Sequence, residues 1–80
     1  MRWFCYLLEC ADGTLYAGIT TSLDRRLAAH NTGSASKYTR ARRPVRLVHT
    51  ERYADRSTAT RRELALKRLS RAGKLALFAR

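Results

Sequence analysis

The sequence predicts an α+β fold, a small three-stranded antiparallel sheet flanked by helices in the order β-β-α-β-α-α. An aromatic and apolar run at residues 3–10 is followed by the turn signal Asp12-Gly13 and a returning strand at 15–20, which together predict a hairpin. A stretch rich in β-branched and aromatic residues at 45–53 predicts the third strand. Because the chain has 80 residues, we expect one domain, 1–80, with any site on a shallow face or groove.

The hairpin allows two registers, and they place the tyrosines differently. A two-residue turn at 12–13 would send Tyr6 and Tyr16 to opposite faces of the sheet. A three-residue loop at 11–13, with its glycine in the left-handed conformation, would pair Tyr6 with Gly18 and put both tyrosines on one face. We predict the three-residue loop, and we expect Gly18 to leave open space beside Tyr6 for a phosphate.

The first helix follows the hairpin, and a long loop follows the helix. Thr21 and Asp24 have the spacing of a capping box, and the helix is expected to stop at 31–33, Asn-Thr-Gly. Residues 33–44 are small and polar, then basic, so we expect the longest loop there. One face of the helix carries residues spaced i, i+4 and i+7: Leu23, Leu27 and His30.

Two further helices are predicted after the third strand. The second helix begins at Asp55-Arg56-Ser57 and runs through about Leu69. A capping box made by Thr60 and Glu63 would instead start it later and use that carboxylate on backbone N–H groups. Ser70 is expected to cap a last short helix ending near Ala79. We favour the start at Ser57, because four residues then share an inward stripe: Ala59, Glu63, Leu66 and Leu69.

The charge of the chain indicates a polyanionic partner. Seventeen Lys and Arg face six Asp and Glu, giving a net charge of +11, and fourteen of the basic residues are arginines. The planar guanidinium suits bidentate contact with phosphate, so DNA is the expected partner, with RNA as the alternative, rather than a membrane. No apolar run approaches the ~20 residues that cross a bilayer. The start of the chain lacks the cleavage site of a signal peptide, which favours a cytoplasmic location.

The predicted loop carries a basic run that contains an aromatic residue and no acid. A charge run is usually only a solvated face, but an interleaved tyrosine could stack on a base. Phosphate contacts of this kind predict salt-dependent binding that depends little on sequence. The residues expected to contact nucleic acid are Lys37, Tyr38, Arg40, Arg42 and Arg43.

Several classes of chemistry are excluded by what the chain lacks. Cys5 and Cys10 fall in one strand with opposite parity, so we expect two packing residues and neither a disulfide nor a zinc site. The six acids are scattered singly, which makes a site with two metal ions improbable. The chain has no Gly-rich phosphate loop and no nucleophile elbow. Hydrolysis of a phosphodiester would therefore use few groups: Tyr, Arg, His and one carboxylate.

These groups occur in a pattern that resembles the GIY-YIG nuclease superfamily, and most closely its small stand-alone bacterial members. The likeness covers essentially the whole chain, although the first triplet keeps only the tyrosine of Gly-Ile-Tyr. The residues that carry it are Phe4-Cys5-Tyr6, Tyr16-Ala17-Gly18, Arg26 and His30, Tyr38-Thr39-Arg40, Arg43-Pro44, and Asp55-Arg56-Ser57 leading to Glu63.

The resemblance implies an endonuclease that hydrolyses DNA with one divalent metal ion, Mg²⁺ or Mn²⁺. Tyr6 would be the general base, its pKa lowered by Arg26 and the metal, and Arg26 would also stabilise the transition state. His30 would orient Tyr6 or relay its proton, and Tyr16 would join the same hydrogen-bond network. Glu63 would hold the metal. Single-stranded, duplex and branched DNA are all open as substrates, and a larger protein partner could supply specificity.

Two other functions are compatible with the same residues. The chain could be a non-catalytic nucleic-acid-binding module of this fold, or a small basic structural protein of a ribonucleoprotein assembly. In either case Tyr6 and Tyr16 would only pack in the sheet, Arg26 would be a solvated helix charge, and His30 would close an apolar stripe. Glu63 would then be one half of a surface ion pair.

Overall fold

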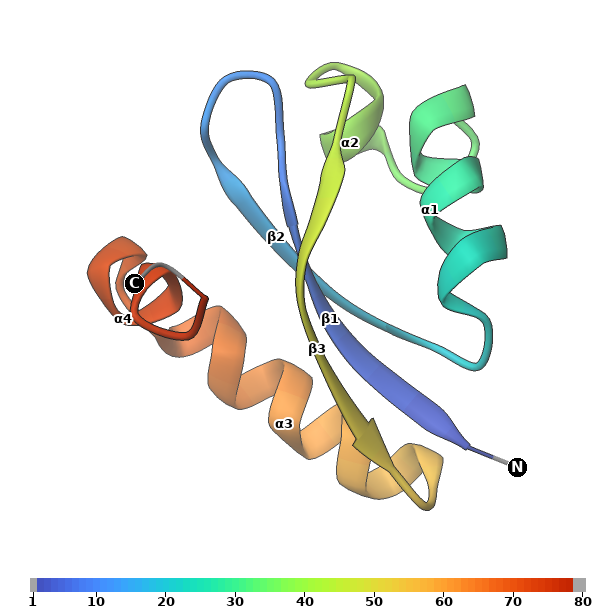
Figure 1. Cartoon of the computed structure of the whole chain (residues 1–80), viewed down its shortest axis with the longest axis vertical. Coiled ribbons are helices and arrows are strands. Elements are labelled where there is room, and N and C mark those ends of the chain that lie inside the picture. The colour runs from blue at the N-terminus through green and yellow to red at the C-terminus, as the bar shows by residue number, and fades with distance from the viewer. Residues whose placement is uncertain (1, 79–80) are drawn as a thin grey trace.

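The computed structural model describes residues 2–78 as a three-stranded antiparallel sheet with helices on both faces (Figure 1). The strands are β1 (Trp3–Glu9), β2 (Leu15–Thr20) and β3 (Arg46–Tyr53), and they lie side by side in the order β2-β1-β3. The first strand of the chain is therefore the central one, hydrogen-bonded along both edges. The predicted fold class is confirmed.

The β1–β2 hairpin has the predicted three-residue loop. Tyr6 pairs with Gly18, so Tyr6 and Tyr16 lie on the same face of the sheet. A hydrogen bond of 2.9 Å from the Gly13 amide to the Cys10 carbonyl closes the loop. Gly13 has φ 83°, a left-handed conformation that glycine adopts without the steric cost of a side chain. The turn thus sets which side chains β1 and β2 present together.

Helix α1 (Leu23–Thr32) covers one face of the sheet. It ends at Gly33, which has φ 85°, as the Asn-Thr-Gly sequence predicted. The predicted capping box at its start is wrong, because Ser22 is the N-cap residue and its side chain makes no capping hydrogen bond. Instead, the Ser22 amide donates to the hydroxyl oxygen of Thr20 at 3.1 Å, so the end of β2 supplies the acceptor.

The segment expected to be a long loop contains one turn of helix, α2 (Lys37–Arg40), also on the α1 side of the sheet (Figure 1). Ser36 is its N-cap, and the Ser36 hydroxyl accepts a hydrogen bond of 3.1 Å from the Thr39 amide. This side-chain acceptor satisfies an N–H that the first turn of a helix leaves without a backbone partner. The same turn carries the aromatic residue of the basic run.

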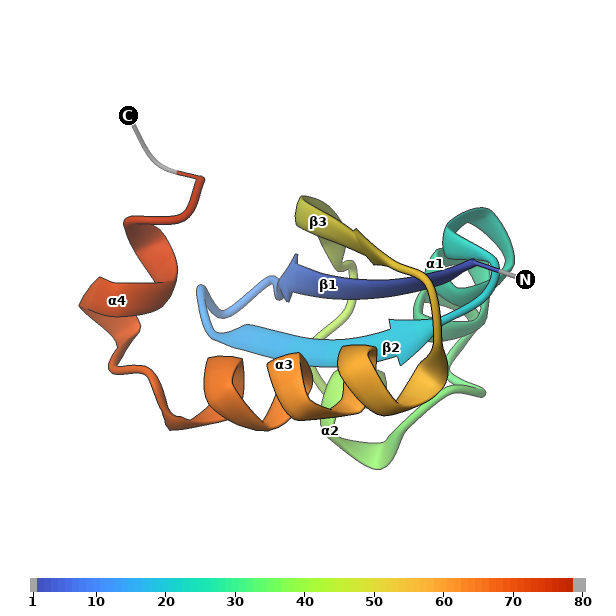
Figure 2. The same ribbon diagram turned by 90° about the horizontal axis from the view of Figure 1, so that it is seen from below.

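Helix α3 (Arg56–Arg68) packs on the opposite face of the sheet (Figure 2). Asp55 caps it by accepting a 2.7 Å hydrogen bond from the Thr58 amide, so the alternative start at Thr60 is wrong. Ala59 and Leu66 are fully buried as expected. Leu69 is 36% exposed where the helix ends, so the expected inward stripe stops one turn earlier.

The last element is the short helix α4 (Arg71–Leu75), which Figure 2 shows beyond the hairpin end of the sheet. Ser70 caps it as predicted, and its hydroxyl accepts a hydrogen bond of 3.0 Å from the Gly73 amide. The predicted end near Ala79 lies outside the described residues. Across residues 2–78, none of the helices has the length and apolarity needed to cross a membrane.

The two faces of the sheet support two separate clusters of buried side chains. On the α3 side, Leu66 of the helix packs against Cys5, Leu7 and Ala17 of the sheet. The cluster on the α1 side consists of Tyr6, Leu8, Cys10 and Val45. Both cysteines are buried and free, one on each face, as their parity predicted. The pairing of β1 with β3 shifts register between Leu7 and Leu8, so exposed and partly buried residues do not alternate regularly along β3.

Candidate functional site

The site begins at the phenol of Tyr6, which β1 presents toward helix α1. Its side chain is only 2% exposed, and its oxygen lies 2.9 Å from Nε2 of His30. The Nε atom of Arg26 donates to the same oxygen at 3.4 Å. Arg26 and His30 lie one helical turn apart, so their side chains leave the same side of α1. The sheet and the helix thus bring these three predicted residues together.

The expected open space beside Tyr6 is not there. The phenol ring of Tyr6 lies directly over Gly18, and a Cβ atom at that position would overlap the ring and its hydroxyl. The absent side chain therefore makes room for Tyr6 itself and not for a phosphate.

Burial dominates the acidity of Tyr6. Removal from solvent raises the pKa of the Tyr6 phenol, while the hydrogen bond and the positive charge of Arg26 lower it. Tyr16 and the carboxylate of Glu63 add smaller effects that raise the pKa. The net shift is upward. Arg26 acts in the expected direction, but burial outweighs it, so Tyr6 is a neutral phenol in this state.

His30 is neutral at physiological pH. It is fully buried, and burial together with the charge of Arg26 lowers its pKa from 6.5 to about 4. A neutral imidazole has one N–H donor and one acceptor nitrogen. The group that binds Nδ1 therefore decides whether Nε2 offers Tyr6 a lone pair or a proton.

Thr39 binds Nδ1 of His30, and the sequence analysis assigned it no such role. Its hydroxyl lies 2.7 Å from Nδ1, and Thr39 is fully buried. The Ser36 hydroxyl lies 2.9 Å from the same Thr39 oxygen. A continuous chain of hydrogen bonds thus runs from Tyr6 through His30 and Thr39 to Ser36. The spacing of Ser36 and Thr39 is typical of a helix start, which could have indicated α2 but not its contact with α1.

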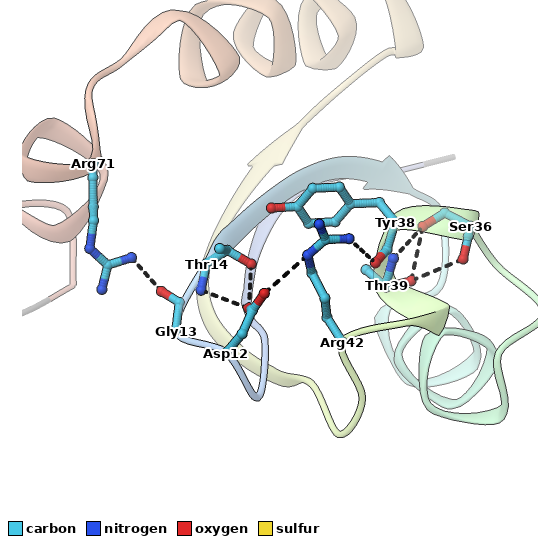
Figure 3. Close-up of polar contacts among 8 residues, drawn as sticks. All are labelled: Asp12, Gly13, Thr14, Ser36, Tyr38, Thr39, Arg42 and Arg71. Atoms are coloured by element: carbon cyan, nitrogen blue, oxygen red, sulfur yellow. Dashed lines mark hydrogen bonds and ion pairs between the residues drawn. The ribbon is translucent and has the colours of Figure 1, made fainter.

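An aromatic stack extends the site from Tyr16 to the basic run. The Tyr16 ring meets His30 edge-on with centroids 5.3 Å apart. The other contact of Tyr16 is with Tyr38, stacked at 5.6 Å and 28°. The guanidinium carbon of Arg42 lies 3.9 Å from the centroid of Tyr38, which is 38% exposed (Figure 3). Tyr38 is therefore part of the cluster rather than an isolated aromatic on a loop.

Two of the five predicted nucleic-acid-binding residues also hold their own segment in place. Arg42 donates to Asp12 at 3.1 Å and to the carbonyl of Tyr38 at 2.9 Å (Figure 3). Arg43 donates to the carbonyl of Arg40 at 3.0 Å. The other two basic residues of the set, Lys37 and Arg40, are exposed on the one-turn helix.

Glu63 lies apart from the other predicted catalytic residues. It projects from α3, on the other side of the sheet, and its carboxylate is 18% exposed and 3.7 Å from Nζ of Lys67. Within residues 2–78, no hydrogen bond or ion pair joins it to the Tyr6 cluster, and no three His, Cys, Asp or Glu side chains form a metal-binding group. Its charge nevertheless acts on the pKa of Tyr6. One carboxylate is compatible with Mg²⁺, which keeps several waters and binds substrate phosphates.

A second polar cluster fastens α3 to the third strand beside Glu63. Arg62 donates to both carboxylate oxygens of Glu51, at 2.7 and 3.0 Å. His49 and Tyr53 bind the same carboxylate at 2.8 and 2.7 Å. The hydrogen bonds from Arg62 first, and then those from His49 and Tyr53, lower the pKa of Glu51 to about 2. This carboxylate therefore fixes how α3 lies on the sheet.

Comparison with known proteins identifies related chains of similar length. The family described as the GIY-YIG catalytic domain matches residues 2–76. A UPF0213 protein of Halobacterium salinarum is 56% identical over 73 residues, which cover 91% of this chain and 95% of the relative. A UPF0213 protein of Cupriavidus pinatubonensis is 46% identical over 79 residues, covering 99% of this chain and 88% of the relative.

Two solved structures are also similar. The solution NMR structure of a UPF0213 protein from Bacillus halodurans has a TM-score of 0.61 and 45% identity, covering 96% of this chain and 82% of that one. The solution NMR structure of a protein from E. faecalis has a TM-score of 0.63 and 45% identity, covering 92% and 79%. The names of these four proteins state no activity.

Proposed function

Because this chain belongs to the GIY-YIG catalytic domain family, we propose that it is a metal-dependent endonuclease that hydrolyses phosphodiester bonds in DNA. Membership in the family supports a nuclease-type function and a nucleic-acid substrate. The observation that carries the proposal is the buried Tyr6 hydroxyl, held at 2.9 Å by the neutral imidazole of His30 and contacted by Arg26. The net charge of +11 would draw the protein to the substrate.

In this proposal Tyr6 takes a proton from the attacking water, and it must first lose its own. If Nδ1 of His30 donates to Thr39, Nε2 carries the lone pair and accepts the proton of the Tyr6 hydroxyl. Arg26 stabilises the resulting phenolate, because its charge already lowers the pKa of Tyr6 against the effect of burial. Thr39 acts as a positioning residue that sets the tautomer of His30.

Arg26 also faces the region where a phosphate can approach. Its guanidinium uses Nε on Tyr6, which leaves donors on its two Nη atoms. An open hollow of about 270 Å³ adjoins it, lined in addition by Arg25 and by hydroxyls of the segment 20–22. A phosphate in this hollow would contact Arg26, which could then stabilise the charge that develops during hydrolysis.

Glu63 is the residue that would hold the divalent ion, Mg²⁺ or Mn²⁺. When bound, such an ion polarises a phosphate oxygen and stabilises the leaving group. The contact of Glu63 with Lys67 is long and the Lys67 side chain is half-exposed, so the contact costs little to exchange for a metal ligand. Glu51 and Arg62 keep α3, and with it Glu63, in a fixed position on the sheet.

The experiment is cleavage of single-stranded, duplex and branched oligonucleotides with Mg²⁺, with EDTA as the metal-free control. Tyr6→Phe keeps the ring over Gly18 and removes only the hydroxyl, and Glu63→Gln removes only the charge. We expect both to reduce cleavage at least ~100-fold and to retain binding. Tyr53→Phe is the matched control, because it also removes one tyrosine hydroxyl, in this case the one that donates to Glu51 on the α3 side of the sheet. This variant should cleave like wild type. Cleavage unaffected by Tyr6→Phe would refute Tyr6 as the base.

A non-catalytic nucleic-acid-binding module is the second candidate. Two observations favour it: burial raises the pKa of Tyr6, and Glu63 makes no contact with the Tyr6 cluster among residues 2–78. Wild-type protein that binds the oligonucleotides but leaves them intact, with either Mg²⁺ or Mn²⁺, would establish this function.

A further inference from the structure

A second hollow lies where the hairpin loop, α2 and α4 meet. It is open, measures about 220 Å³, and is lined by residues from three separate parts of the chain. Figure 3 shows Arg71 reaching from α4 to Gly13, while the hydroxyl end of Tyr38 points toward Thr14. The lining residues are Thr14, Leu15, Tyr38, Arg71 and Lys74.

This arrangement is held by specific contacts on both sides. The Arg71 guanidinium donates to the carbonyl of Gly13, which ties α4 to the hairpin loop. On the loop, the Thr14 hydroxyl donates to Asp12 at 2.6 Å. Asp12 in turn accepts from Arg42, the residue that lies over the Tyr38 ring. The walls of the hollow are therefore connected to one another rather than brought together by chance.

The lining groups suit a phosphate. Arg71 and Lys74 are cations with several N–H donors, and the Tyr38 phenol can donate one more hydrogen bond. No carboxylate lines the hollow among the described residues. The closest acid along the loop, Asp12, is occupied by Thr14 and Arg42, and these contacts lower its pKa and keep it charged. A guanidinium, an ammonium and a phenol are typical partners of a phosphate oxygen.

The hollow is also connected to the Tyr6 cluster through contacts between aromatic rings. Tyr38 lines it and stacks on Tyr16, and Tyr16 contacts His30. Two successive ring contacts thus lead from Tyr38, which lines the hollow, to His30, which binds the Tyr6 hydroxyl. A strand that had its scissile phosphate at Arg26 and passed along Tyr38 would bring another of its phosphates to α4.

We propose that Arg71 and Lys74, with the Tyr38 hydroxyl, form a binding site for a phosphate of the nucleic-acid strand outside the one that is cut. This inference rests on the proposed function, because it takes nucleic acid as the substrate. It assigns α4, which the basic run of the sequence did not include, to substrate binding. The phosphate is an internal one or the terminal one of a cut strand, since both present the same oxygens.

The test measures binding and does not depend on cleavage. Fluorescence anisotropy with a labelled single-stranded oligonucleotide in EDTA gives the dissociation constant over a series of salt concentrations. The double variant Arg71→Gln/Lys74→Gln should weaken binding by 5- to 50-fold and should lower the log–log salt slope by about 1.4, the value for two lost contacts on a single strand. The single variant Lys74→Gln keeps the bond from Arg71 to Gly13. It should lower the log–log salt slope by about half as much as the double variant does.

The matched control removes the same charge at the far end of the molecule. Arg2 and Arg52 line another open hollow, with Tyr53, where β3 ends. Arg2→Gln/Arg52→Gln should change the salt slope by less than about 0.5. An equal loss in both double variants would overturn the proposal, because it would show diffuse attraction rather than a site.

Two comparisons identify the phosphate and separate this proposal from the nuclease itself. An effect of Arg71→Gln/Lys74→Gln that requires a 5′-phosphorylated oligonucleotide assigns the site to a terminal phosphate. An effect that persists with a hydroxyl end assigns it to an internal phosphodiester. Wild type that cleaves DNA while the double variant keeps its affinity and salt slope would overturn the α4 site alone. If the double variant lowered the salt slope of binding but the wild type cleaved no oligonucleotide, the result would support the α4 site and refute the nuclease.

Discussion

The phenol ring of Tyr6 lies against Gly18, its partner across the β1–β2 hairpin, so closely that a Cβ atom there would overlap the hydroxyl. Gly18 has an ordinary strand conformation, so its role is the absence of a side chain and not an unusual φ. This pairing allows the phenol oxygen to lie 2.9 Å from His30.

Gly18→Ala should displace the Tyr6 ring and break its hydrogen bond to His30. Because the ring is buried, we expect the free energy of unfolding to fall by about 1–3 kcal/mol, the usual cost of overpacking. Urea denaturation measures the loss, and cleavage should fall with it. Gly73→Ala in α4 is the control, since a Cβ there would make an ordinary 3.4 Å contact. If Gly18→Ala proved as stable and active as Gly73→Ala, the ring would not need the space.

Thr39→Val should expose the role of the hydroxyl that binds His30. Valine has nearly the shape of threonine but leaves Nδ1 of a fully buried imidazole without a partner, which costs about 1–3 kcal/mol. The ¹⁵N NMR signals of the His30 ring should shift, because the tautomer is no longer fixed. Thr39→Ser keeps the hydroxyl and should restore both the signals and most of the cleavage. Equal behaviour of the two variants would contradict a positioning role.

His30 should make the protein less stable in mild acid. Its pKa is about 4 in the folded protein and 6.5 ordinarily, so the unfolded chain binds the proton first as the pH falls. The stabilisation is complete above pH 6.5 and is lost as the pH falls through about 4, on the order of 3 kcal/mol in total. Urea unfolding across this range measures it. His30→Gln should flatten the profile, and an unchanged slope in that variant would assign the pH dependence to other groups.

Glu51→Gln should loosen α3 from the sheet. The change removes the charge that binds two Arg62 nitrogens and leaves a half-buried guanidinium poorly paired, so we expect a loss of about 2 kcal/mol. Glu9→Gln is the matched control, because the partner of Glu9, Arg46, is 70% exposed and such pairs contribute less than about 1 kcal/mol. Thermal or urea unfolding distinguishes them. Similar losses in the two variants would show that the Glu51 cluster has no special role.

Turn, parity and capping signals in the sequence were sufficient to predict the hairpin and most helix ends. Strand parity and the preference of Gly13 for positive φ correctly predicted the register that joins Tyr6 to Gly18. Gly33 and Ser70 ended and capped their helices as expected, because these signals act within a few residues. The capping box at Thr21 failed because the helix begins one residue later, with Ser22 as its N-cap.

The same local signals could not predict the contacts between helices and strands that are distant in the sequence. The sequence showed that Gly18 lacks a side chain but not that Tyr6 would fill the gap. It placed Glu63 on the inward stripe of its helix but could not show that this helix covers the face opposite Tyr6. The bond between His30 and Thr39 joins two helices, and no periodicity within either one predicts it.

The central position of β1 gives the two sides of the site different structural support. Because β1 is bonded along both edges, the amide of Tyr6 should exchange with deuterium only when the whole sheet opens. Tyr38 stands instead on a single helical turn, steadied by Arg42 and the exposed carboxylate of Asp12. We therefore expect the Tyr38 side to open more readily than the strand that carries the Tyr6 hydroxyl.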